Sequence, residues 1–229
     1  RVANQHDSTV ELDVDALEAN LRHYRSLLPE GTRIMAMLKA NAYGLGAVPV
    51  ARVLERHRLD YLGVAYPEEG RELREAGIRT PIMVLNPGEP SFELMLRHRL
   101  EPELFSWDRL RAFSEAFARH PDSLGEVLVH VKVDTGMHRL GFDENDINEL
   151  LNILTAHKGL KVLSVLSHLS SSDDAHLDEY THAQLTLFEQ LTSKIQQHIG
   201  YEFMKHIANT AAILRFPTAQ YDMVRLGIG

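Results

Sequence analysis

The chain has 229 residues, 44% of them hydrophobic and 24% charged, which is ordinary for a soluble globular protein and enough for one large α/β domain. The net charge of −8 argues against a general nucleic-acid binder, and the absence of cysteine excludes disulfides and thiolate zinc sites. We find neither a membrane-spanning apolar run nor the apolar core of a signal peptide, so a cytoplasmic protein without membrane or nucleic-acid partners is expected.

Short apolar runs alternate with segments of helical periodicity along the whole chain, as in repeated βα units. The first helical pattern carries Leu17, Leu21, Tyr24 and Leu28 at helical spacing. The strands themselves are nearly continuous in Val, Ile and Leu, which favours a parallel sheet buried on both faces. We expect eight of them, over residues 34–38, 61–65, 82–85, 102–105, 127–133, 162–169, 204–209 and 223–226. Eight strands at this spacing predict an α/β fold of the (β/α)8 TIM-like barrel type.

The two ends of the chain depart from a plain barrel. Residues 9–14 have the pattern of an extra strand before the first helix. At the other end, Gly229 follows directly on the eighth predicted strand, so we expect the last helix of a complete barrel to be lacking. The chain also starts without Met, which suggests that it was cut from something longer. We predict a single, truncated barrel domain over residues 1–229.

Polar residues recur where the predicted strands end. Lys39 follows the first strand, 134–139 the fifth, and His168 closes the sixth. Residues 209–210 close the seventh strand, and Arg225 lies in the eighth. Because the carboxyl ends of barrel strands meet at one rim, where barrel enzymes hold their active sites, these side chains are expected to converge.

Two interpretations of Lys39 are open from the residues alone. A lysine at a strand end can extend its ammonium into solvent. Alternatively, it can serve as a Schiff-base lysine whose amine is a nucleophile. The neighbouring Tyr43, Gly44 and Gly46 could admit a phosphate to a phenol and to backbone amides, although a Gly-x-Gly alone is weak evidence.

The fifth strand places charged residues inside a buried element. His130, Lys132 and Asp134 alternate with Val129, Val131 and Val133, so the two sets face opposite sides. A buried ammonium is costly unless it is paired. Lys132 is therefore predicted either to pair with a neighbouring carboxylate or to have a functional role.

A metal site is not expected. His168, Asp173, Asp174 and His176 are metal-type ligands, but their spacing matches no metal motif. An acidic, Ser-rich loop that leads into a helix is more typical of a solvated helix cap.

Six motifs, in order along the chain, resemble the alanine racemases. They are Lys-Ala-Asn-Ala-Tyr-Gly-Leu-Gly at 39–46 and the stretches 64–74, 131–142, 167–169, 208–210 and 223–229. The resemblance implies the barrel of the alanine racemase N-terminal type, which binds pyridoxal 5′-phosphate. The sequences of the stretches 137–142, 167–174 and 216–223 most resemble the racemase half of fused polypeptides that carry a muramoyl-tripeptide:D-alanyl-D-alanine ligase upstream.

The resemblance also implies roles for individual residues. Lys39 would hold the cofactor as an internal aldimine and then act as the base on one face of the substrate Cα. Tyr43 and Thr210, with the backbone N–H groups of Gly227 and Ile228, would hold the phosphate. The family usually has Ser at the position of Thr210, and Thr keeps the hydroxyl.

Further implied roles concern the cofactor ring and the substrate. Arg225 would donate to the pyridine nitrogen, and His168 would orient Arg225. Arg139 would contact the phenolic oxygen of the cofactor and the substrate, and Lys132 would be a carbamylated lysine that positions Arg139. Asn209, next to Thr210, is expected among the cofactor-binding residues.

The implied activity is the interconversion of L-alanine and D-alanine for peptidoglycan synthesis, by a homodimer in the full-length protein. The family takes its second base, a tyrosine, from a C-terminal β-domain of the other subunit. The 229-residue chain lacks that domain and is expected to be inactive or weakly active. Two alternatives are a stand-alone barrel that binds pyridoxal phosphate in cofactor homeostasis, and a D-amino-acid aldolase or dehydratase of the same fold.

Overall fold

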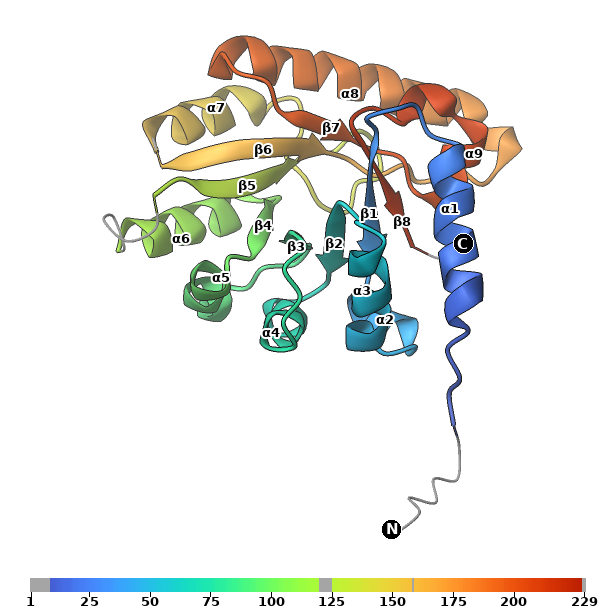
Figure 1. Cartoon of the computed structure of the whole chain (residues 1–229). Coiled ribbons are helices and arrows are strands. Elements are labelled where there is room, and N and C mark those ends of the chain that lie inside the picture. Colours follow the sequence, from blue (N-terminus) through green and yellow to red (C-terminus); the bar gives the residue numbers. More distant parts are fainter. Residues whose placement is uncertain (1–8, 120–124, 158, 228–229) are drawn as a thin grey trace.

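The computed structural model describes residues 9–119, 125–157 and 159–227, and it shows a closed ring of parallel strands surrounded by helices (Figure 1). The eight strands are β1 (Arg33–Met37), β2 (Tyr61–Val64), β3 (Ile82–Val84), β4 (Glu101–Leu104), β5 (Val127–Lys132), β6 (Leu160–Leu166), β7 (Met204–His206) and β8 (Met223–Leu226). All eight predicted strands are present, and the barrel prediction is confirmed.

The strands pair in the order β7-β6-β5-β4-β3-β2-β1-β8, each pair parallel. The ring closes between β7 and β8, where Arg225 N donates to Ala208 O at 3.0 Å and Asp222 N donates to Lys205 O at 3.2 Å. Closure leaves no open sheet edge among these strands and brings all eight carboxyl ends to one rim.

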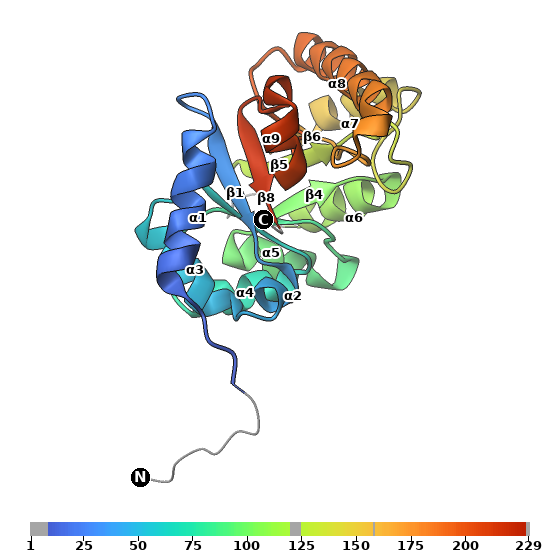
Figure 2. The same cartoon turned by 90° about the vertical axis from the view of Figure 1, so that its right-hand side faces the viewer.

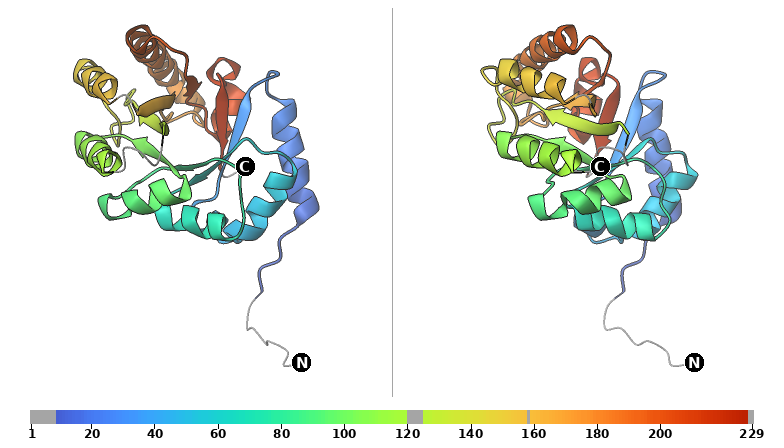
Figure 3. Two further views of the ribbon diagram at one scale, coloured as in Figure 1. Left: turned by 60° about the vertical axis from the view of Figure 1, so that its left-hand side comes forward. Right: turned by 90° about the vertical axis from the view of Figure 1, so that its left-hand side faces the viewer.

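Helices cover the outer face of the ring (Figures 2 and 3). They are α1 (Val14–Ser26), α3 (Ala47–Arg56), α4 (Pro67–Glu75), α5 (Phe92–His98), α6 (Trp107–Ala118), α7 (Ile147–Ala156), α8 (Asp178–Ile199) and α9 (Thr210–Arg215). A short turn, α2 (Lys39–Tyr43), follows β1, and the 3-10 turns are η1 (Glu89–Ser91), η2 (Ala175–Leu177) and η3 (Pro217–Ala219). In the part of the chain that the structure describes, no helix combines the length and the apolar composition needed to cross a membrane.

The strand predicted over residues 9–14 is wrong. Residues 9–13 have no regular secondary structure, and α1 begins at Val14. The reason is a helix cap, because the carboxylate of Asp13 accepts a hydrogen bond from Ala16 N at 2.9 Å. The segment before the cap has no strand partner among the described residues.

Two layers of side chains fill the inside of the ring. One is apolar and rich in methionine, and it contains Met35, Tyr61, Met83, Leu166, Met204 and Met223. The other is polar and buried, and it contains Glu103, His130, Lys132, Ser164, His206 and Arg225. The valines of β5 belong instead to the larger apolar core between strands and helices. The predicted alternation along this strand is therefore confirmed for His130 and Lys132.

Candidate active site

A cavity of about 370 Å³ lies at the carboxyl ends of the strands. Its polar lining consists of Lys39, Tyr43, Glu103, Lys132, Arg139, His168, Asp173, Asn209, Thr210, Arg225 and Gly227. Every predicted site residue in the described part of the chain thus lines this one cavity. Ile228, predicted to hold phosphate, lies outside the described residues.

Lys39 is followed at the rim by a left-handed backbone turn. The four residues after it, 40–43, have φ between 52° and 54°, and none of them is glycine. Left-handed backbone costs roughly 1–2 kcal/mol for each such residue, and strain of this kind clusters at functional sites. The turn directs the Lys39 amine toward the aromatic ring of Tyr43, whose centroid is 6.0 Å from Nζ.

Two side chains outside the predicted site hold this strained turn. Glu69 accepts a hydrogen bond from Ala40 N at 2.8 Å and, with its other oxygen, from Ala65 N at 2.7 Å. Asn41 accepts from Ala47 N at 2.7 Å, which ties the turn to the start of α3. Sequence reasoning missed Glu69, although an acidic residue in the first turn of a helix is a common capping signal.

Tyr43, Thr210 and Gly227 form one narrow end of the cavity. Gly227 N donates to Thr210 Oγ1 at 3.0 Å. A Cβ at Gly227 would come within 3.0 Å of the Tyr43 hydroxyl, so a side chain there would fill the space. Burial raises the pKa of Tyr43, which keeps its phenol protonated as a donor. Two hydroxyls and a backbone N–H thus surround a space suited to a phosphate.

Asn209 lies beside this end with its side chain already engaged. Its Oδ1 accepts from Ala212 N at 3.0 Å and from Ser172 Oγ at 2.8 Å, so it caps α9 and fixes the loop after β6. A contact of its amide with a cofactor stays a prediction.

Arg225 is buried at the bottom of the cavity and donates to five acceptors. NH1 donates to His206 Nδ1 at 2.8 Å and to His206 O at 3.1 Å. NH2 donates to Ser167 O at 2.6 Å, to Ile207 O at 3.2 Å and to His168 Nδ1 at 3.3 Å. Burial lowers the pKa of Arg225 to about 10, so it still carries its charge at neutral pH.

His168 is held as a neutral imidazole. Burial and then the charges of Arg225, Lys132, Arg139 and Lys39 lower its pKa to about 3. Since a guanidinium only donates, Nδ1 of His168 accepts and Nε2 carries the proton. The contact between these two side chains agrees with the predicted orientation of Arg225 by His168.

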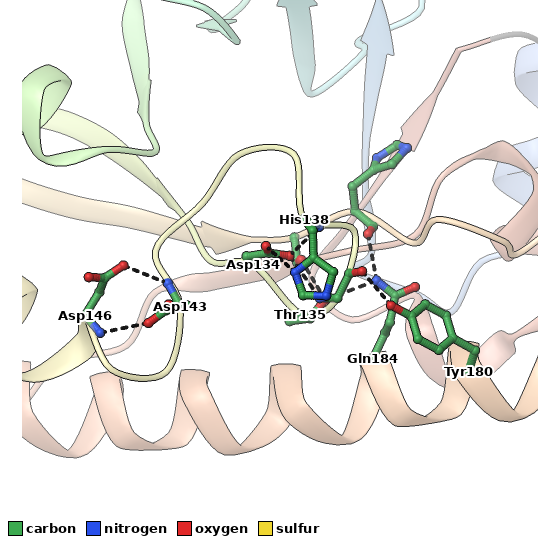
Figure 4. Close-up of polar contacts among 10 residues, drawn as sticks. Asp134, Thr135, His138, Asp143, Asp146, Tyr180 and Gln184 are labelled. Carbon is green, nitrogen blue, oxygen red and sulfur yellow. Dashed lines mark hydrogen bonds and ion pairs between the residues drawn. The ribbon is translucent and has the colours of Figure 1, made fainter.

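The loop between β5 and α7 brings Arg139 to the cavity. Figure 4 shows Asp134, Thr135 and His138 of this loop beside Tyr180 and Gln184 of α8. Asp134 accepts from the backbone N–H groups of Gly136 and His138, and Tyr180 of α8 donates to Gly136 O. The loop closes tightly, because a Cβ at Gly141 would come within 2.6 Å of Asp134 N. Arg139 itself is exposed at the cavity mouth.

Lys132 is paired with a carboxylate that sequence analysis did not single out. Its Nζ is 2.9 Å from Glu103 Oε1, with side-chain exposures of 9% and 1%. The other oxygen, Glu103 Oε2, is buried without a hydrogen-bond partner among the described residues. Of the two interpretations of Lys132, these contacts describe the ion pair, and carbamylation stays a prediction. The sequence feature that could have indicated this partner is that Glu103 is a charged residue inside the predicted buried strand 102–105.

The buried histidines predict a loss of stability in acid. His168 has its pKa lowered to about 3, and burial, with Arg225 and other cations, lowers the pKa of His206 in the same direction. Below pH 6.5 these two histidines are protonated in the unfolded chain, whereas in the folded chain they stay neutral until a much lower pH. Stability therefore falls as the pH drops from 6.5 toward 3, by about 2 kcal/mol from His168 by pH 5, and His206 acts in the same direction. Urea unfolding at pH 7.5 and 5 measures this, and a His168→Gln variant should lose part of the dependence. An unchanged urea midpoint in wild type would contradict it.

No group of three metal-type ligands lies together in the described ranges. His168 lines the cavity while Asp174 accepts from His176 N at 2.9 Å, a local cap of the kind expected from the sequence.

A closed parallel barrel with lysines, arginines and a neutral histidine around one rim cavity defines a barrel protein suited to a small anionic ligand. Residues 12–229 match the family described as alanine racemase, N-terminal domain, and the chain belongs to that family.

Individual relatives agree with this assignment. Alanine racemase 1 of Oceanobacillus iheyensis is 36% identical over 233 residues, a match that covers 100% of this chain and 60% of that protein. Alanine racemase of Geobacillus stearothermophilus is 35% identical over 97% of this chain and 56% of its own length. The chain therefore spans less than two thirds of the relatives it matches.

Solved structures show the same barrel. Alanine racemase from Bacillus anthracis with bound L-Ala-P has a TM-score of 0.87 and 30% identity, covering 98% of this chain and 57% of that one. Alanine racemase from Bartonella henselae with covalently bound pyridoxal phosphate has a TM-score of 0.82 and 27% identity, covering 95% and 58%.

The residues of this chain fit such a cofactor. The narrow end at Tyr43, Thr210 and Gly227 offers donors and a backbone cradle that a Cβ would fill. At the other end, Arg225 has its NH1 and NH2 groups engaged by protein acceptors, while its Nε–H donates to no acceptor within the described chain. The donor set therefore suits a ligand with a phosphate at one end and a lone-pair acceptor at the other.

Proposed function

We propose that this barrel binds pyridoxal 5′-phosphate and contributes to the interconversion of L-alanine and D-alanine. The observation that carries the proposal is the convergence of Lys39, Arg225 and the hydroxyls of Tyr43 and Thr210 on one cavity. When bound, the cofactor supplies a conjugated ring that withdraws electrons from the substrate Cα.

The chain's own groups divide the work. Lys39 would hold the cofactor aldehyde through its amine and, once the substrate amine has displaced it, would take and return the Cα proton on one face. Tyr43, Thr210 and Gly227 N–H would hold the phosphate. Arg225 would donate to the ring nitrogen, and because a guanidinium keeps its proton, that nitrogen would carry no proton of its own. Such a ring would withdraw electrons weakly, which would favour return of the proton to Cα over side reactions.

Arg139 and Asp173 complete the mouth of the cavity. We place the Arg139 guanidinium against the phenolic oxygen of the cofactor and the substrate carboxylate, since a guanidinium suits a planar anion. In the full-length protein we propose a homodimer in the cytoplasm that supplies D-alanine for peptidoglycan.

A hydrogen-exchange experiment tests this function. The chain is incubated with pyridoxal phosphate and L-alanine in D₂O, and loss of the Cα–H signal is followed by proton NMR while D-alanine is assayed enzymatically. We expect Cα exchange at least about 100-fold above cofactor alone, the scale of a positioned general base. Exchange should outpace D-alanine formation, since Lys39 reaches one face of Cα.

The outcomes separate the alternatives. Cofactor binding without Cα exchange would favour the homeostasis barrel and overturn the proposed catalytic role. Exchange with a β-hydroxy amino acid but not with alanine would favour an aldolase or dehydratase.

A further inference from the structure

A line of hydrogen bonds crosses the inside of the barrel from Arg225 to Glu101. Arg225 NH1 is 2.8 Å from His206 Nδ1, and His206 Nε2 is 2.8 Å from Ser164 Oγ. Ser164 Oγ is 2.6 Å from His130 Nδ1, and His130 Nε2 is 2.8 Å from Glu101 Oε2. Residues of five neighbouring strands, β8 to β4, thus join a guanidinium at the cavity to a carboxylate at the start of β4.

The protonation of this line follows from its two ends. A guanidinium only donates, so His206 Nδ1 accepts, and the proton of neutral His206 lies on Nε2, from which it is donated to Ser164. A carboxylate only accepts, so His130 donates from Nε2 to Glu101 and, as a neutral ring, accepts at Nδ1 from the Ser164 hydroxyl. With both rings neutral, one arrangement satisfies every member, and all donors run from Arg225 toward Glu101.

Burial makes this arrangement consequential. His130, Ser164 and His206 are fully buried, and the Glu101 side chain is 14% exposed. A buried donor left without an acceptor costs about 1–3 kcal/mol, so each bond restrains the next. Burial, and then the charge of Arg225, lowers the pKa of His206, which keeps that ring neutral.

Other charged or titratable groups surround the line. Lys132 and Glu103 form their own ion pair beside it. Burial, and then the charge of Glu101, raises the pKa of Tyr61, with Arg33 acting in the opposite direction. The carboxylate of Glu101 accepts from His130 and ends the line. Neither Glu101 nor Ser164 lines the cavity.

We propose that Glu101 and Ser164 are positioning residues that orient Arg225 from inside the barrel. By fixing the His206 proton on Nε2, they keep Nδ1 free to accept from Arg225 NH1. The opposite tautomer would set an N–H against the guanidinium and displace it. With NH1 and NH2 held, Arg225 presents Nε–H to the cavity. This last step rests on the proposed function, whereas the tautomers do not.

The tautomers can be measured directly in the ligand-free chain. Long-range proton–nitrogen NMR on ¹⁵N-histidine protein distinguishes Nδ1–H, Nε2–H and imidazolium rings, with signals assigned by single histidine substitutions. We expect His130 and His206 as Nε2–H rings between pH 6 and 8. A His206 Nδ1–H ring, or a charged His130 at neutral pH, would overturn the proposal.

A matched pair of serine variants then tests the link to Arg225. Ser164→Ala removes the central hydroxyl, whereas Ser114→Ala removes a similarly buried hydroxyl that donates to Leu110 O within α6 and lies off the line. We expect Ser164→Ala to mix the His206 tautomers and to weaken pyridoxal phosphate binding about tenfold, and Ser164→Thr to restore both. Ser114→Ala should leave both within twofold of wild type.

The results distinguish this proposal from the proposed function. Equal spectra and equal affinities for the two alanine variants would overturn the positioning role. Wild type that shows the expected tautomers but binds no pyridoxal phosphate would overturn the function and leave the line standing. If Ser164→Ala fails to fold, the wild-type tautomer measurement still decides.

Discussion

Replacing Lys39 with Ala is expected to abolish covalent capture of pyridoxal phosphate by this chain. Lys39 carries an amine at the cavity rim, held there by a strained turn. Borohydride reduction of the wild-type mixture should leave a stable adduct that peptide mass spectrometry locates at Lys39. The absorbance band of the bound cofactor should disappear in Lys39→Ala.

The control is Lys161, an exposed lysine outside the cavity. Lys161 is 43% exposed, pairs with Glu126 at 3.1 Å and does not line the cavity. Lys161→Ala should keep the adduct and its absorbance. Equal labelling of wild type and Lys39→Ala would mean that the aldehyde reacts nonspecifically, and the function proposed for this barrel would fall.

Replacing Glu103 with Ala is expected to give the largest loss of stability of any single change described here. It leaves the Lys132 ammonium inside the barrel without the carboxylate 2.9 Å away. Breaking a buried pair from one side typically costs about 3–5 kcal/mol, whereas an exposed pair contributes about 0–1 kcal/mol. Urea unfolding of Glu103→Ala and Glu126→Ala, whose partner is exposed Lys161, compares the two cases.

The double variant Glu103→Leu with Lys132→Met should recover most of that stability, because both charges are then removed together. If Glu103→Ala unfolds at the wild-type urea concentration, the pair does not exist in solution.

The same ion pair bears on the predicted carbamylation of Lys132. A carbamate would place a second anion beside the Glu103 carboxylate, in a buried site where like charges repel strongly. NMR spectra of wild type equilibrated with ¹³C-bicarbonate separate the two states, because a spectrum without a carbamate carbon would leave the ion pair as the state of Lys132. A carbamate signal that disappears in Lys132→Met would show the modification and would require a different partner for Glu103.

The barrel could be predicted because its evidence is repeated along the chain. Each βα unit carries an apolar run and a helical pattern, so errors of a few residues at the strand ends leave the topology unchanged. The site could be predicted for a related reason. Parallel strands bring their carboxyl ends together, and Lys39, His168 and Arg225 share a rim whatever the detailed register.

What could not be predicted depends on register and on local competition. Glu103 meets Lys132 because β4 and β5 align Glu103 with His130, two residues before Lys132, and no pattern in either strand specifies that alignment. The left-handed turn at 40–43 could not be predicted from residue propensities, since alanine and tyrosine strongly favour other conformations. Residues 9–14 looked like a strand because a helix cap such as Asp13 competes with a local alternation of apolar residues.

Oxidation of the methionine layer inside the ring would report how often the barrel opens transiently. Met35, Met83 and Met223 are shielded from solvent, so oxidants reach their thioether sulfurs only when strands separate. Conversion to sulfoxide would then place a polar group beneath the ion pairs and keep the ring from reclosing. Each transient separation of the strands would then lead to lasting damage. The lifetime of the fold in peroxide would therefore depend on how often the strands separate.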